Sequence, residues 1–162
     1  AETMGDLYTE NATDGPSVPA ASIVDYGAGQ IAGVHLALGE RYLHGASFVV
    51  RDFLNALVRR LFPEPTVEVT GSHDVDVTLN RLDDKLMVNL VNTSGPHANR
   101  DIYACDEIPP VGPLRVTLRL DAAPSAIIRE PEHVPMDYTY EGGEVVLSLD
   151  RLDIHTVLVV ER

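Results

Sequence analysis

Tryptophan is absent from this 162-residue sequence, and all aromatic residues together make up only 6% of it. A sugar-binding platform built on exposed Trp is therefore excluded. Basic residues are also scarce, because 12 Lys and Arg stand against 25 Asp and Glu and leave a net charge of −13. Such a surface repels nucleic acid and anionic membranes, so we expect neither as a partner.

Cys105 is the only cysteine, which excludes an intrachain disulfide and a zinc site made of several cysteines. No apolar run approaches the roughly 18 residues of a membrane-spanning helix. The first residues lack the charged-then-apolar layout of a signal peptide, so we expect a cytoplasmic protein. Residues 1–20 are polar and contain Pro16 and Pro19. They predict an extended leading segment that looks like the middle of a longer protein.

What the sequence does contain fits a globular protein, with 44% hydrophobic and 23% charged residues. It falls into two unlike parts. Residues 21–62 read as strand, turn, strand, loop and helix, whereas residues 66–162 read as strands only. Pro63 and Pro65 mark the short linker between them.

Three glycines in "VDYGAGQIAGVH" (residues 24–35) come close to the loop that binds a dinucleotide pyrophosphate. Such a loop needs a helix directly after it, because the helix N-terminus binds the anion. Here Ile31, Val34 and Leu36 suit a buried strand, and the first convincing helix starts only near Ser47. We therefore interpret "GAGQ" as a hairpin loop, in which glycine supplies a positive φ.

The stretch "SFVVRDFLNALVRRLF" (residues 47–62) predicts an amphipathic helix. Ser47 is a suitable N-cap, and Arg59 and Arg60 suit the negative end of the helix dipole. One hairpin and one helix cannot bury the apolar stripe of this helix. Either the second part of the chain covers it, or a piece outside the chain does. The stripe consists of Val49, Val50, Phe53, Leu54, Leu57, Val58 and Leu61.

From residue 66 the hydrophobic period changes to two, which is typical of antiparallel strands with one solvated face. With hairpin turns at "LDDK" and "EGG", these strands predict an antiparallel β-sandwich or a flattened barrel. The eight predicted strands are "TVEVT", "VDVTLNR", "KLMVNLVN", "LRVTLRL", "SAIIRE", "MDYTY", "EVVLSL" and "IHTVLVV".

Residues 93–113 form an unusually long connection, and compact domains seldom carry one without a binding or contact role. It mixes apolar and charged side chains, as interfaces do. We predict a contact surface here, against the helix, a partner domain or a second copy. Its anchors and pairing charges are Arg100, Ile102, Tyr103, Asp106 and Ile108.

Catalytic chemistry finds little support. Cys105 lies beside Asp106 and close to Glu107, whose charges raise a thiol pKa and weaken it as a nucleophile. The sequence contains no G-x-S-x-G motif, so it offers no recognisable nucleophilic serine for a serine hydrolase. Glycoside hydrolysis needs two facing carboxylates, and no pair stands out among the 25 acidic residues.

Two histidine-containing stretches are candidate sites. "SHDVD" offers His73, Asp74 and Asp76 as metal ligands, but a solvated turn is the favoured interpretation. His155 lies in the very apolar "LDIHTVLVV" and is interpreted as a core histidine. Asn92, at the end of a predicted strand, can bond to the backbone of the long connection.

Five stretches stand in a recognisable order: "ASIVDYGAGQIAGVHLALGERY", "VVRDFLNALVRRLFPEPTVEVTG", "VDVTLNRLDDKLMVNLVNTSG", "PPVGPLRVTLRL" and "LDIHTVLVVE". This order resembles the C-terminal region of certain bacterial glycoside hydrolases, akin to family 42 β-galactosidases and α-L-fucosidase-like hydrolases. In that architecture a catalytic (β/α)8 barrel precedes a glutamine-amidotransferase-like α/β domain and a small β-sandwich. The resemblance implies that residues 21–62 are the hairpin-helix tail of the amidotransferase-like domain.

The resemblance implies a function through what is missing. These families carry their nucleophile and acid/base on the barrel, and neither those motifs nor an amidotransferase triad occurs here. It therefore implies a non-catalytic accessory and assembly region with no cofactor and no metal. Its partners would be the barrel and the amidotransferase-like domain of a parent hydrolase and, in a homo-oligomer, further copies of the chain.

Other function classes stay open. A carbohydrate-binding module on the sandwich needs exposed aromatic side chains, and its candidates are Tyr103, Tyr138 and Tyr140. A self-sufficient enzyme needs a placed carboxylate pair, which the sequence does not show. An unrelated binding or adaptor domain remains.

Overall fold

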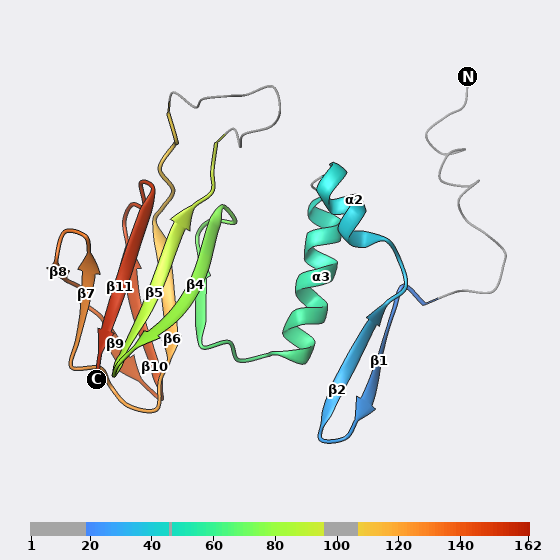
Figure 1. Cartoon of the computed structure of the whole chain (residues 1–162), viewed down its shortest axis with the longest axis horizontal. Coiled ribbons are helices and arrows are strands. Elements are labelled where there is room, and N and C mark those ends of the chain that lie inside the picture. Colours follow the sequence, from blue (N-terminus) through green and yellow to red (C-terminus); the bar gives the residue numbers. More distant parts are fainter. Residues whose placement is uncertain (1–18, 46, 96–106) are drawn as a thin grey trace. The chain divides into compact units, whose positions relative to one another are not determined.

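The computed structural model describes residues 19–45, 47–95 and 107–162, and for residue 41 the backbone alone. The chain divides into two compact units, Ala1–Pro63 and Glu64–Arg162, which we call the N-terminal unit and the sandwich (Figure 1). The predicted class is confirmed, since most described elements are antiparallel strands preceded by a hairpin and helix. No helix among the described residues is long and apolar enough to cross a membrane.

The glycine-containing stretch forms a β-hairpin. Strands β1 (Ala21–Tyr26) and β2 (Gly29–Val34) pair antiparallel around a two-residue turn. Gly27 takes φ +58° in this turn, a conformation that tight hairpin turns require and that glycine adopts without strain. A strand, not a helix, follows Gly29, so the predicted hairpin loop is confirmed.

Helix α3 (Phe48–Leu61) confirms the predicted amphipathic helix. Ser47 occupies the N-cap position, although its side chain forms no capping hydrogen bond. A second helix, α2 (Leu38–Gly45), was not predicted. Its two turns begin and end near glycines, which lower helix propensity and favoured a loop interpretation. Glu40 in its first turn and His44 in its last turn suit the helix dipole and were the overlooked signal.

The sandwich consists of two antiparallel sheets (Figure 1). The four-stranded sheet has the order β3–β6–β10–β9, and the five-stranded sheet has the order β4–β5–β11–β7–β8. The strands are β3 (Val67–Thr70), β4 (Val75–Leu82), β5 (Lys85–Asn92), β6 (Leu114–Arg119), β7 (Ala126–Glu130), β8 (Val134–Pro135), β9 (Thr139–Glu141), β10 (Glu144–Leu149) and β11 (His155–Glu161).

The strand predictions hold with two corrections. The stretch "MDYTY" contributes only its end to the short β9, and β8 was not predicted. Residues 136–138 lie between these two strands, which belong to different sheets. The chain therefore crosses from one sheet to the other within the stretch that period-two alternation had assigned to a single strand.

The core lies between the two sheets and is made by the inward-facing members of each alternating strand. In β6 and β10, buried apolar residues alternate with exposed or half-buried ones, as expected for sheets with one solvated face. In contrast, β11 carries apolar Val157 and Val159 on its outer face as well. The buried cluster comprises Leu86, Val88, Leu90, Leu114, Val116, Leu118, Ile127, Val145, Leu147, Leu149, Leu152, Leu158 and Val160.

Asn92 closes one end of the sandwich. Its side chain is only 6% exposed. The amide nitrogen donates to the carbonyl oxygens of Pro109 at 2.9 Å and Asp153 at 2.7 Å, and its oxygen accepts the N–H of Ser94 at 2.9 Å. Ser94 Oγ donates to the Pro109 carbonyl at 2.7 Å. The predicted bond between Asn92 and the long connection is confirmed, and the two ends of that connection are fastened side by side.

Arg119 fixes the start of the sandwich. Its guanidinium donates to the backbone carbonyl of Pro65 at 2.7 Å and pairs with Glu144 at 3.0 Å and Glu68 at 3.5 Å. Where β5 begins and β11 ends, Lys85 and Glu161 form an ion pair at 2.6 Å. The hydrogen bond in this pair and the charge of Glu161 raise the pKa of Lys85.

We predict that Asn92→Ala lowers the free energy of unfolding of the chain by about 3 kcal/mol, because it leaves several buried or half-buried backbone groups without partners. Asn89→Ala is the matched control, since Asn89 makes one side-chain bond of 3.3 Å, to the Thr78 carbonyl, and should cost less than about 1 kcal/mol. Urea unfolding measures both. Equal losses in the two variants would contradict the central role of Asn92.

We also predict that residues 64–162 fold without the N-terminal unit, because every member of the buried cluster belongs to the sandwich. A fragment of this span should show one cooperative urea transition and a β-type circular dichroism spectrum. The same fragment extended to residue 47 is the control. A molten short fragment that becomes cooperative only when Phe53, Leu57 and Leu61 are present would show a shared core instead.

Candidate functional site

Most of the predicted interface lies outside the described residues, namely Arg100, Ile102, Tyr103 and Asp106. Ile108 is described and is 38% exposed. It precedes Pro109, whose carbonyl oxygen is held by Asn92 and Ser94. The interface prediction for residues 93–113 therefore stays a prediction, with a firmly bound end at Pro109.

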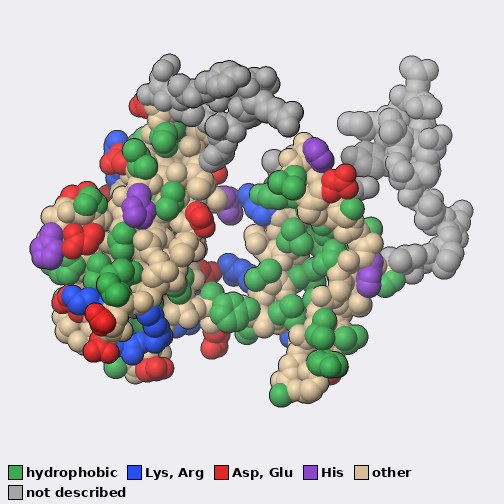
Figure 2. Space-filling model, in the orientation of Figure 1, with side chains coloured by type: hydrophobic (Ala, Val, Ile, Leu, Met, Phe, Trp, Pro, Cys, Tyr) green, Lys and Arg blue, Asp and Glu red, His purple; other side chains and the backbone are tan. Residues whose placement is uncertain are grey.

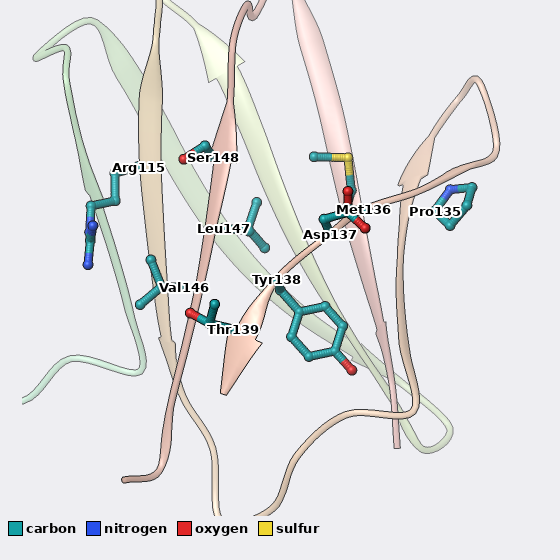
Figure 3. A pocket seen from close by; sticks show the side chains of 9 residues that line it. All are labelled: Arg115, Pro135, Met136, Asp137, Tyr138, Thr139, Val146, Leu147 and Ser148. Carbon is teal, nitrogen blue, oxygen red and sulfur yellow. The ribbon is translucent and has the colours of Figure 1, made fainter. Parts of the chain in front are cut away.

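An open groove of about 630 Å³ lies where the crossing segment 136–138 leaves the edge of β10. Strand β9 pairs with β10 only from Glu144 to Val146, so the rest of β10 has no neighbour on that side among the described strands. In the view of Figure 3, Arg115 lies at one end of the groove and Pro135 at the other, with Ser148 and Asp137 between them. The lining residues are Arg115, Pro135, Met136, Asp137, Tyr138, Thr139, Val146, Leu147 and Ser148.

Four polar side chains of this groove have no partner in the described part of the chain. They form neither an ion pair nor a hydrogen bond there and are Arg115, Asp137, Thr139 and Ser148. A guanidinium only donates, a carboxylate only accepts, and hydroxyls do both. A ligand rich in hydroxyl groups satisfies such a mixture. Asp137 is the only carboxylate in the lining, so the groove lacks the pair that glycoside hydrolysis uses.

The tyrosines predicted to contact sugars have mainly structural roles where they are described. Tyr138 is half-buried against the core, and its hydroxyl donates to the Pro124 carbonyl at 2.6 Å. Tyr140 is 36% exposed, and its hydroxyl donates to the Leu120 carbonyl at 3.4 Å. Tyr103 lies outside the described residues. Of the three, Tyr138 lines the groove.

The stretch "SHDVD" forms the turn before β4. The backbone N–H of Asp74 donates to Ser72 Oγ at 3.0 Å, and His73, Asp74 and Asp76 are exposed. No group of three or more metal-binding side chains occurs within residues 19–45, 47–95 and 107–162.

The prediction of a core histidine is wrong, because His155 is exposed. In β11 the alternation places Thr156, Leu158 and Val160 inward and His155 outward. Because both faces of this strand carry apolar residues, the sequence pattern does not show which face His155 is on.

The described part of the N-terminal unit, residues 19–45 and 47–63, has almost no buried residues. Helix α3 buries none of its side chains, and the unit's one buried apolar residue in the described part is Leu38. Along α3, Val50, Phe53, Leu54 and Leu57 are half-buried, so the predicted stripe is only partly covered. Figure 2 shows hydrophobic side chains gathered over the surface of the hairpin and the helices. The exposed ones are Val24, Tyr26, Ile31, Val34, Leu36, Tyr42, Leu43, Phe48, Val49, Val58, Leu61 and Phe62.

One face of the hairpin is apolar and open to solvent. Val24 and Ile31 lie directly opposite each other on β1 and β2 and are about half exposed, and Tyr26 is 73% exposed. On the same face, Ser22 Oγ and His35 Nε2 lie 2.9 Å apart. Sequence reasoning did not find this pair, because it depends on the register of the hairpin.

No family model and no curated protein matches the sequence. Among solved structures, the chain is similar to α-L-fucosidase isoenzyme 2 from Paenibacillus thiaminolyticus, with a TM-score of 0.70 and 20% identity. The match covers 86% of this chain and 21% of the fucosidase chain. The chain thus spans about a fifth of the length of that protein and shares the fold of a part of it.

Proposed function

We propose that this chain is a non-catalytic C-terminal accessory and assembly region of a glycoside hydrolase. In this proposal the sandwich is its stable module, and residues 21–62 are the tail of an amidotransferase-like domain that the rest of the enzyme completes. The region supports the fold and the oligomerisation of a sugar-cleaving parent, whose catalytic groups lie elsewhere.

The absence of a core in the described part of the N-terminal unit carries this proposal. A soluble domain rarely leaves a large contiguous apolar surface open unless a partner covers it. Here both the hairpin face with Val24 and Ile31 and much of helix α3 remain exposed. The likeness to about a fifth of a fucosidase chain supports a larger polypeptide as the source of the missing cover.

We expect the isolated chain to leave the nitrophenyl glycosides of fucose, galactose and arabinose intact, because the described residues offer no facing carboxylate pair in the groove. Release of nitrophenol, followed by absorbance, is the measurement. Turnover that survives purification and disappears when one acidic residue of this chain is replaced would overturn the accessory role.

A second test of the accessory role examines the gene that encodes this chain. The reading frame upstream of the codon for Ala1 should encode a catalytic barrel, and the resulting longer protein should hydrolyse one of these glycosides. In that protein, Val24→Lys should lower thermal stability, because it places a charge in the proposed covered face. Asp121→Lys, at an exposed position of the sandwich outside β4, is the matched control. An upstream frame without a barrel would contradict the parent enzyme.

A second candidate function is carbohydrate binding in the groove beside β10. The observation that favours it is the set of four unpartnered polar side chains around a volume of about 630 Å³, a size within the usual range for ligand pockets. Against it stands the inward packing of Tyr138, which leaves the groove without a flat aromatic platform.

For this second candidate we expect L-fucose or D-galactose to bind with millimolar affinity, because an open groove buries little of a ligand. Amide shifts in an NMR titration should saturate and map to residues 135–139 and 146–148. Asp137→Ala should abolish them, whereas Asp84→Ala, in the exposed turn between β4 and β5 of the other sheet, should not. Shifts that never saturate, or that persist in Asp137→Ala, would exclude the groove as a sugar site.

A further inference from the structure

The described strands of the sandwich form two sheets with four edges, and one of these edges differs from the others. Strands β3, β8 and β9 are edges of four, two and three residues. Proteins commonly protect edges by such shortness, or with prolines and charges. Strand β4 is an edge of eight residues without proline, glycine or lysine.

The register shows which backbone groups of β4 are free. The carbonyls of Asp74 and Thr78 accept bonds from Thr93 and Asn89, both at the β5 side. Backbone groups alternate between the two sides of a strand. The N–H and C=O groups of alternate residues therefore face the open side, and these residues are Val75, Val77, Leu79 and Arg81.

The side chains of β4 also indicate a missing neighbour. Val75, Val77 and Leu79 pack against the core but stay half-buried, while the corresponding positions of central β5 are fully covered. On the outer face, Leu82 is 59% exposed. A further strand beyond β4 would cover these residues and pair all four open backbone positions.

We propose that β4 pairs antiparallel with β4 of a second copy of this chain, about a two-fold axis through Thr78. Two residues that lie directly opposite each other in an antiparallel pair have their side chains on the same face of the sheet. A two-fold axis between two identical strands must therefore place one residue opposite its own copy. The axis at Thr78 is the register that uses all four open positions, because it pairs Val75 with Arg81 and Val77 with Leu79.

The side chains of β4 are compatible with this pairing. Val77 and Leu79 meet on the core side, and Asp76 lies opposite Asn80 on the outer side, where a carboxylate and an amide can share a hydrogen bond. The two charged residues of β4, Asp76 and Arg81, each face a neutral residue, so no like charges meet. Two-fold pairing of one surface with itself is also the commonest way in which chains associate.

This inference deepens the assembly part of the proposed function but rests on the sandwich alone. A monomeric chain would overturn the β4 pairing and would leave the tests of the parent enzyme unaffected. A strand of another domain lying against β4 would also leave the isolated chain monomeric.

The first experiment is a disulfide test in the full chain with Cys105→Ser as background. Opposite residues have Cα atoms about 4.5–5.5 Å apart, within the range of a disulfide. Thr78→Cys should therefore form a covalent dimer with oxidised glutathione. Asp76→Cys is the matched control on the same face of the same strand. In the proposed register its two copies lie about 13 Å apart, four residues along the strands, and should link at least about tenfold more slowly.

The second experiment measures association without a cross-link. Val77→Pro removes an N–H that faces the open side, where an edge strand tolerates proline, and it leaves the pairing with β5 intact. Sedimentation equilibrium should show a dimer for the parent chain and at least a roughly tenfold weaker dimer for Val77→Pro, with an unchanged circular dichroism spectrum. A monomeric parent chain, a dimer unaffected by Val77→Pro, or equal cross-linking of Thr78→Cys and Asp76→Cys would each overturn the proposal.

Discussion

The buried amide of Asn92 connects three segments that are distant in the sequence. It lies at the end of β5, accepts the N–H of Ser94 just after that strand, and donates to the approach to β11 at Asp153 and to the return of the long connection at Pro109. Each of these backbones ends or begins at the same rim of the core, where unpaired carbonyl groups would otherwise be buried at a high free-energy cost. This one side chain, which both donates and accepts, therefore adds to the backbone hydrogen bonds between Val111 and Leu152 and from Asn92 to Ile154 that also close this rim.

The N-terminal unit lacks any comparable point of closure in its described part. Its hairpin has a single pair of strands, and α3 buries no side chain. A two-stranded hairpin is marginal by itself, since three or more strands or a good packing surface are needed for stability. The contrast between the two units explains why the proposals for them differ: the N-terminal unit needs a cover, and the sandwich needs at most a neighbouring strand.

The sequence predicted those features that depend on local pattern. Period two located most strands, and Gly27 marked the hairpin turn. The pattern was misleading where both faces of a strand are apolar, as in β11, because alternation then no longer tells inside from outside and His155 was placed in the core. The crossing at residues 136–138 and the groove beside it could not be predicted, since they depend on where β9 leaves β10. The same holds for the Ser22–His35 pair, which only the hairpin register brings together.

The fastening of Ser94 to Pro109 has a consequence for how this protein can vary. Both ends of the long connection are held by the sandwich itself, through bonds that do not involve the residues between them. Lengthening a closed loop changes its closure entropy only slowly, by about 0.6 kcal/mol for each doubling. Relatives can therefore exchange or extend the sequence between these two residues at little cost to folding, and an engineer could insert a foreign peptide there while keeping the β framework unchanged.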